Sequence, residues 1–97
     1  MKKVSWSIAK NLLLKENKHR SICFEDILAV LENEGYLDDI AHPNQDKYPH
    51  QRMFVVLVND YVSGVPYVET EAEIFLKTAF QSRRLKNTYL TGKANDT

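Results

Sequence analysis

Residues 53–58 read Met-Phe-Val-Val-Leu-Val, and this run is apolar at odd and even positions alike. Successive side chains of a strand point to opposite faces of a sheet, so the run predicts a strand in the middle of a sheet. Asn59 and Asp60 follow at once, and such a pair is typical of a tight hairpin turn. The chain is therefore expected to fold around a hairpin whose first strand is central.

Two further strands are predicted after this turn, over residues 61–68 and 73–80. A short strand is predicted before the central one, near residues 37–41. Pro66 has no N–H to donate to a ladder, which places its strand at a sheet edge or makes it irregular, and Gly64 marks a candidate bulge. In the strand over 73–80, alternation assigns one face to Ile74, Leu76, Thr78 and Phe80, and the other to Phe75, Lys77 and Ala79.

Three helices are predicted from apolar spacing and capping residues. The first runs from Ser7 to about Asn17, with Ser5 or Ser7 as N-cap and an apolar stripe of Ile8, Leu12, Leu13 and Leu14. The second begins after Cys23, which stands in for a capping serine, and ends at Gly35; its stripe is Phe24, Ile27, Leu28 and Leu31. The third runs from Arg83 to Leu90, with Ser82 as N-cap and Gly92 at its end.

These elements predict an α+β fold in which two N-terminal helices pack on a three- to four-stranded antiparallel sheet, with a short C-terminal helix. The chain has 97 residues, enough for one domain, which we expect over residues 1–91 with a flexible tail over 92–97. Cys23 is a lone cysteine, so no intrachain disulfide is expected. With no apolar run of the roughly 20 residues that a membrane span needs, the chain is interpreted as cytoplasmic.

Formal net charge is zero, but the charges are segregated along the chain. Residues 25–39 carry six acids and no base, whereas residues 77–93 carry five bases and no acid. Arg83 and Arg84 occupy the first helical turn, where the helix dipole disfavours cations. With Ser82, Lys77 and Lys86 nearby, the segment predicts an anion site suited to phosphate. The alternative is that Arg83 or Arg84 pairs with the acidic helix.

The segment His-Pro-Asn-Gln-Asp-Lys-Tyr-Pro-His-Gln-Arg, residues 42–52, is stiffened by two prolines and is rich in functional side chains. His42 and Tyr48 are candidates for proton transfer, and Lys47 and Arg52 for contacts with RNA. The histidines lack the spacing of metal ligands, so neither a metal nor another cofactor is expected. The remaining aromatic residues are expected in the core, except Tyr89 in the basic helix.

The order of several short motifs resembles the BrnT-like toxins of the wider RelE/ParE-like group of toxin–antitoxin systems. The matching residues are Trp6, Lys10 and Asn11, then Phe24 and Glu25, and finally Ser82, Arg83 and Tyr89, over roughly residues 4–91. The resemblance implies a bacterial endoribonuclease that cleaves RNA without a metal and is neutralised by a cognate antitoxin protein. By motif match, it assigns catalytic roles to Lys77, Arg83 and Tyr89.

A second interpretation comes from a different class of protein. In it the chain is a non-catalytic interaction domain whose basic segment, residues 77–93, docks an acidic partner or the second subunit of a homodimer. RNA turnover separates the two interpretations, because only the first requires it.

Overall fold

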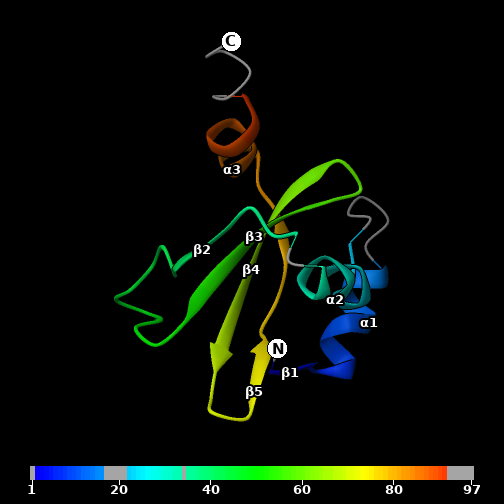
Figure 1. Ribbon diagram of the computed structural model, residues 1–97, viewed down its shortest axis with the longest axis vertical. Helices are drawn as coiled ribbons and strands as arrows, with labels where there is room; N and C mark the ends of the chain where they lie inside the picture. Colours follow the sequence, from blue (N-terminus) through cyan, green and yellow to red (C-terminus); the bar gives the residue numbers. More distant parts are fainter. Residues whose placement is uncertain (1, 17–21, 34, 92–97) are drawn as a thin grey trace.

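The computed structural model describes residues 2–16, 22–33 and 35–91 (Figure 1). Its elements follow the chain in the order β1 (Lys3–Trp6), α1 (Ile8–Glu16), α2 (Phe24–Glu32), β2 (Asp38–Ala41), β3 (Arg52–Val58), β4 (Tyr61–Glu69), β5 (Glu73–Leu76), β6 (Phe80–Gln81), α3 (Arg83–Lys86) and the π-helical turn η1 (Asn87–Thr91). This is the predicted α+β class, with two N-terminal helices and a short helix after the sheet. The predicted tail over residues 92–97, with Gly92, lies outside the described residues.

The sheet is larger than predicted, with six strands in the order β1-β5-β4-β3-β2 and β6 paired to β4. Most pairs are antiparallel, but β1 runs parallel to β5, with Lys3 opposite Glu73 and Trp6 opposite Leu76. β1 was not among the predicted strands. Trp6 on this strand packs against Phe24 of α2, with ring centroids 5.5 Å apart.

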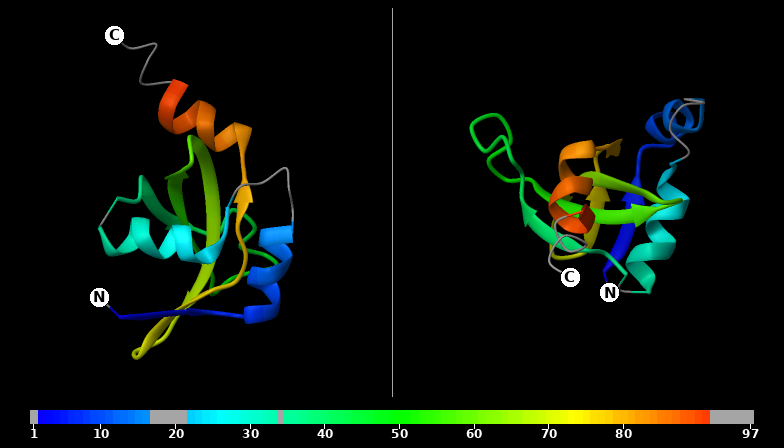
Figure 2. Two further views of the ribbon diagram at one scale, coloured as in Figure 1. Left: turned by 90° about the vertical axis from the view of Figure 1, so that its right-hand side faces the viewer. Right: turned by 90° about the horizontal axis from the view of Figure 1, so that it is seen from above.

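β3 is covered on both faces, as its two-sided apolar pattern predicts. Phe54 and Val56 face the main core, which α2 closes from the side where both N-terminal helices lie (Figure 2). Met53 and Val55 face a second, smaller core, against which Leu85 and other apolar residues of α3 and η1 pack. The two groups of helices thus cover opposite faces of the sheet. None of the helices in the described part of the chain is long and apolar enough to cross a membrane.

The hairpin between β3 and β4 turns at Asn59 and Asp60, as predicted. Both residues have positive φ, 51° and 68°, and Val58 pairs with Tyr61 on either side of them. A two-residue turn with positive φ at both positions matches the right-handed twist of the strands that it joins.

The strand that contains Pro66 is not at an edge, because β4 lies between β3 and β5, so the irregular strand is the predicted alternative that the structure has. The Lys77 N–H donates to the Pro66 carbonyl at 2.8 Å, but Pro66 has no N–H with which to complete the pair. The β4–β5 ladder accordingly stops at the Tyr67–Leu76 pair. Proline is accommodated in an inner strand because the neighbouring strand departs at that point.

After β5 the chain pairs with β4 a second time as β6, and the segment between β5 and β6 contains a bulge. Tyr67 pairs with Leu76, and Gly64 pairs with Phe80. Between these two pairs β4 has two residues, 65 and 66, whereas the segment opposite has three, 77–79. One extra residue reverses the faces that follow it. Ala79 therefore joins Leu76 in the main core and Phe80 enters the second core, so the predicted faces are wrong for Ala79 and Phe80.

Gly64 lies opposite this bulge and is not itself the bulged residue. A Cβ at this position would lie 2.8 Å from both Met53 Sδ and Phe80 Cζ. The missing side chain therefore gives these two larger side chains room to meet over the strand.

The predicted apolar stripe of α1 is wrong in its orientation. Ile8, Leu12 and Leu13 are 76%, 53% and 61% exposed, whereas Asn11 and Leu14 are buried. Asn11 faces inward because its Oδ1 accepts from the Phe24 N–H and its Nδ2 donates to Glu25 Oε1, both at 2.8 Å. The helix is oriented by these two hydrogen bonds to the start of α2.

The predicted caps have mixed outcomes. Ser7 caps α1, since its Oγ accepts from the Lys10 N–H at 3.2 Å. Cys23 is at the N-cap position of α2 but does not replace a capping serine, because its thiol donates to Asp26 Oδ2 and caps no backbone N–H. Burial is the largest cause of the raised pKa of Cys23, so the thiol form is favoured over the thiolate.

Candidate functional site

The basic segment follows the bulge and is displayed on the surface. Lys77 is exposed at the bulge, and Arg83, Arg84 and Lys86 are exposed on α3. Ser82 caps this helix as predicted, with its Oγ accepting from the Leu85 N–H at 3.1 Å. Because Leu85 packs into the second core, the turn that carries these cations is fixed to the sheet.

Part of the segment lines a surface hollow of about 500 Å³, which we call the basic hollow. Its lining consists of Tyr61, Val62, Gln81, Ser82, Arg83, Lys86 and Asn87. The structure therefore brings together three of the predicted phosphate contacts, Ser82, Arg83 and Lys86. Lys77 and Arg84 lie outside this lining.

The alternative prediction, in which an arginine pairs with the acidic helix, is not supported. Glu25 at the start of α2 pairs with Lys15 at 3.0 Å, and the other described ion pairs are Lys2–Glu69 and Arg52–Asp39. The helix α2 lies on the other face of the sheet from α3. Within residues 2–16, 22–33 and 35–91, Arg83 and Lys86 form no ion pair, so their charge is available to an anion.

Tyr61 is a member of the basic hollow that the sequence analysis missed. It was expected in the core, but it is 49% exposed and sits directly after the hairpin turn. Its position in the sequence could have indicated this exposure, because the first residue after a two-residue turn lies at the end of the sheet. A half-exposed tyrosine beside two cations offers a surface on which a base can stack.

The segment between β2 and β3 forms a second group of predicted residues. The rings of His42 and Tyr48 meet with centroids 4.5 Å apart, and Lys47 Nζ lies 5.3 Å from the centre of the Tyr48 ring. His42 Nδ1 accepts from the Asn44 N–H at 3.0 Å, so the neutral ring carries its proton on Nε2. The structure thus brings His42, Tyr48 and Lys47 together.

This loop and the turn of the β3–β4 hairpin are at opposite ends of the hairpin (Figure 1), and Tyr61 of the basic hollow directly follows that turn. Arg52, where the loop ends, pairs with Tyr67, whereas Tyr61 of the hollow pairs with Val58. At about 3.3 Å per residue, the strand between these pairs spans roughly 20 Å. His42 and Tyr48 therefore do not reach a phosphate that is held at the basic hollow.

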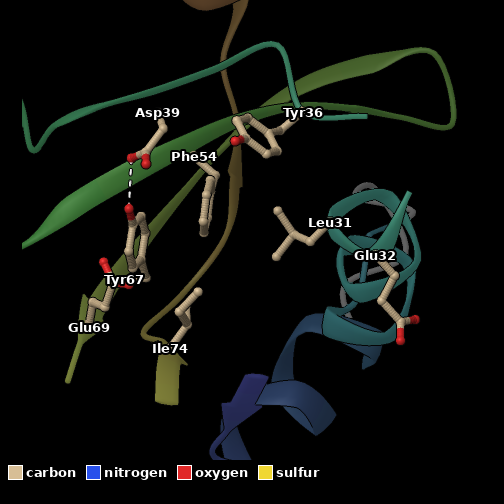
Figure 3. A pocket seen from close by; sticks show the side chains of 8 residues that line it. All are labelled: Leu31, Glu32, Tyr36, Asp39, Phe54, Tyr67, Glu69 and Ile74. Atoms are coloured by element: carbon tan, nitrogen blue, oxygen red, sulfur yellow. Dashed lines mark hydrogen bonds between the residues drawn. The ribbon is translucent and has the colours of Figure 1, made fainter. Parts of the chain in front are cut away.

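Arg52, a predicted RNA contact, is held by neighbours within the fold. Its Nε lies 3.1 Å from Asp39 Oδ1 and its Nη2 donates to the Asp39 carbonyl at 2.8 Å. The same Oδ1 accepts from the Tyr67 hydroxyl at 2.7 Å, as Figure 3 shows. The hydrogen bond with Tyr67 is the largest cause of the raised pKa of Arg52, and the hydrogen bond with Asp39 is the second. Burial, followed by the hydrogen bond to Asp39, raises the pKa of Tyr67. These groups tie β2, β3 and β4 together.

Tyr89 is likewise engaged inside the fold. Its hydroxyl donates to Asp38 Oδ2 at 2.7 Å and its ring packs against the second core. The hydrogen bond to the carboxylate raises the pKa of Tyr89 and lowers that of Asp38. A phenol in this state is a poorer acid than a free one, and its evident role is to join η1 to β2.

No group of three histidine, cysteine or acidic side chains that could hold a metal occurs among the residues that the structure describes. Comparisons with models of protein families, with curated proteins and with solved structures found no match to this chain.

Proposed function

We propose that the chain is the toxin of a bacterial type II toxin–antitoxin system, a cytoplasmic, metal-independent endoribonuclease that a cognate antitoxin neutralises. The observation that carries the proposal is the basic hollow, in which Arg83 and Lys86 have no ion pair among the described residues and Tyr61 is half exposed. Cations beside an exposed aromatic ring are what a single-stranded RNA needs, with phosphates on the charges and a base on the ring. The resemblance supplies the class of reaction.

In this proposal the basic hollow binds the phosphate at which the strand is cut. The 2′-OH loses its proton and attacks the phosphorus, and the 5′-oxygen leaves with a proton, so the charge on the phosphate grows in the transition state. Arg83 and Lys86 stabilise that charge. Tyr61 and Ser82 line the same hollow and carry exchangeable protons, whereas Tyr89 acts through the structure, by fixing η1.

The direct test is RNA binding and cleavage by the purified chain and by single variants. Arg83→Ala and Lys86→Ala should weaken binding and reduce its salt dependence, and Tyr61→Leu should weaken binding about fivefold or more through lost stacking. Arg84→Ala is the matched control, because it removes the neighbouring guanidinium from outside the hollow. Equal losses for Arg83→Ala and Arg84→Ala would mean that the hollow is not the binding site.

Cleavage is tested separately from binding. Induced expression in a bacterial host should stop growth, and purified protein should cut RNA in the presence of a chelator; Arg83→Ala should abolish both effects. A wild-type chain that neither arrests growth nor cuts RNA would exclude the toxin proposal.

The second candidate is the non-catalytic interaction domain, in which the basic segment binds an acidic partner. The distance of His42 and Tyr48 from the basic hollow favours it, because no histidine lines the hollow. This candidate predicts a saturable complex with an acidic peptide, without RNA turnover and without any effect of a His42/Tyr48 double substitution.

A further inference from the structure

The wall of the basic hollow contains one residue to which the proposed function gives no role, Gln81 of β6. Gln81 is half-buried, and its amide Nε2 is buried without a hydrogen-bond partner among the described residues. A buried donor without an acceptor is destabilising, so native proteins contain few of them. Because this donor belongs to a residue that lines the hollow, a ligand that supplies an acceptor removes the penalty.

The residue opposite Gln81 on β4 does not satisfy this amide. Ser63 is the register partner of Gln81 in the β4–β6 pair, and its side chain is fully buried. The Ser63 Oγ likewise has no hydrogen-bond partner in the described part of the chain. Two unpaired polar groups are therefore register partners here, and the fold pairs neither of them.

Tyr61 and Gln81 are placed to act on the same ligand. Tyr61 and Ser63 are two residues apart on β4, so their side chains leave the same face of the sheet. Gln81 shares this face because it lies directly opposite Ser63. Tyr61 and Gln81 are thus diagonal neighbours, which are typically about 7 Å apart. A base that stacks on the Tyr61 ring has its edge within reach of the Gln81 amide.

The hydrogen-bonding groups of the hollow determine which base edge is favoured. Arg83 and Lys86 can only donate hydrogen bonds, and no residue in the lining carries a carboxylate. The unpaired nitrogen of Gln81 is a donor as well. The exocyclic amine of adenine or cytosine would therefore meet other donors, whereas O6 of guanine or O4 of uracil would accept from them.

We propose that Gln81 reads the base beside the bound phosphate by donating from Nε2 to the carbonyl oxygen of guanine or uracil. The inference rests on the proposed function, because it assigns base specificity to the same hollow. Phosphate contacts and aromatic stacking are tolerant of sequence, so discrimination falls to the amide. On binding, the half-buried amide turns from the protein interior toward the base, a rotamer change of the kind that is common at interfaces. A base without the carbonyl leaves the amide unpaired and is rejected.

Recognition of the carbonyl is tested with pentanucleotides that have one variable base between cytidines. The variable base is hypoxanthine (as inosine), guanine or adenine, and every ribose is 2′-O-methylated so that no 2′-OH can attack the phosphate. Inosine and adenosine differ only at position 6 and in the adjoining N1 proton, so the ratio of their affinities reports on the group that Gln81 reads. The inosine and guanosine probes should each bind about fivefold or more tightly than the adenosine probe.

Substitutions at Gln81 connect this ratio to the amide. Gln81→Met keeps the length of the side chain but has no donor, so the inosine probe should bind no more tightly than the adenosine probe. Gln81→Glu replaces the donor by an acceptor and should reverse the preference, which a purely structural role would not do. Gln51→Met, in the loop that precedes β3 and outside the lining, is the matched control and should keep the ratio. The ratio is measured within each folded variant, so a change in stability does not affect it.

Equal affinities of the wild-type chain for inosine and adenosine probes would overturn the inference, as would a ratio that Gln81→Met leaves unchanged. If binding in either case still requires Arg83, the proposed RNA site stands without base recognition. A Gln81-dependent preference in a chain that cuts no RNA would support the inference and overturn the proposed reaction. Absence of saturable binding to all three probes would overturn both.

Discussion

Asn11 joins the first two helices, and its replacement by alanine tests the orientation of α1. The substitution leaves the Phe24 N–H without its acceptor in a place that Phe24 and Asn11 keep buried. A buried donor that loses its partner costs about 1–3 kcal/mol. We therefore expect Asn11→Ala to lower the free energy of unfolding by about 2 kcal/mol at pH 7, which for a domain of this size lowers the melting temperature by about 10 °C.

Leu12→Ala is the matched control on the same helix. Leu12 is more than half exposed, so its truncation should cost less than about 0.5 kcal/mol. The apolar pattern of the sequence predicts the reverse order, with the leucine as the costly position. Urea denaturation of the two variants decides between them, and a larger loss for Leu12→Ala would refute the observed orientation.

The same variant has a defined pH dependence through Glu25. Hydrogen bonds from Asn11 and then Lys15 lower the pKa of Glu25 from 4.5 to about 2. Because the folded pKa is the lower one, this contribution to stability is complete above about pH 4.5 and is lost as the pH falls toward 2. The difference in stability between wild type and Asn11→Ala should therefore narrow over that interval. A constant difference from pH 7 to pH 2 would show that Glu25 is not linked to Asn11.

Three further substitutions or reactions test other features. Gly64→Ala should lower the free energy of unfolding by about 1–3 kcal/mol in thermal denaturation, because its Cβ would meet Met53 and Phe80 at 2.8 Å. Gly35→Ala, whose Cβ would have its nearest contact at 3.4 Å, should lower it less. Equal losses of stability in the two variants would contradict this prediction. Tyr89→Phe should cost about 1–2 kcal/mol at pH 7, and progressively less at acid pH as Asp38 is protonated; complete loss of RNA cleavage by the folded variant would instead give the phenol a chemical role. Iodoacetamide should modify Cys23 with a pH midpoint above that of a free cysteine thiol, and a midpoint at or below the free value would disprove the raised pKa.

The local features of the fold were predictable because they depend on neighbours in sequence. The Asn59–Asp60 turn, the two-sided strand over 53–58 and the Ser82 cap each follow from a few adjacent residues. The inward position of Asn11 depends on groups of α2, and no helical periodicity places a polar residue in a core. β1 is four residues long, and only its parallel pairing with β5 makes it a strand.

The place of Pro66 illustrates the same limit. A proline excludes an inner strand only if a neighbour continues alongside it, and the departure of the chain at Lys77 could not be read from residues 61–68. The candidate site was partly predictable for the same reason. Ser82, Arg83 and Lys86 are close in sequence, whereas Tyr61 reaches the basic hollow through the pairing of β4 with β6.

The pairing of β1 with β5 sets an order of events during synthesis. β1 is made first, but its partner is made late: the Ser5 hydroxyl donates to Glu73, 68 positions further along the chain. The hairpin of β3 and β4 contains local contacts and needs nothing that follows it, whereas the outer strand must wait. Tyr61 also waits for Arg83 and Lys86 before the basic hollow exists. Residues 1–82 have therefore all been synthesised before Arg83 and Lys86 can complete the surface proposed to bind RNA.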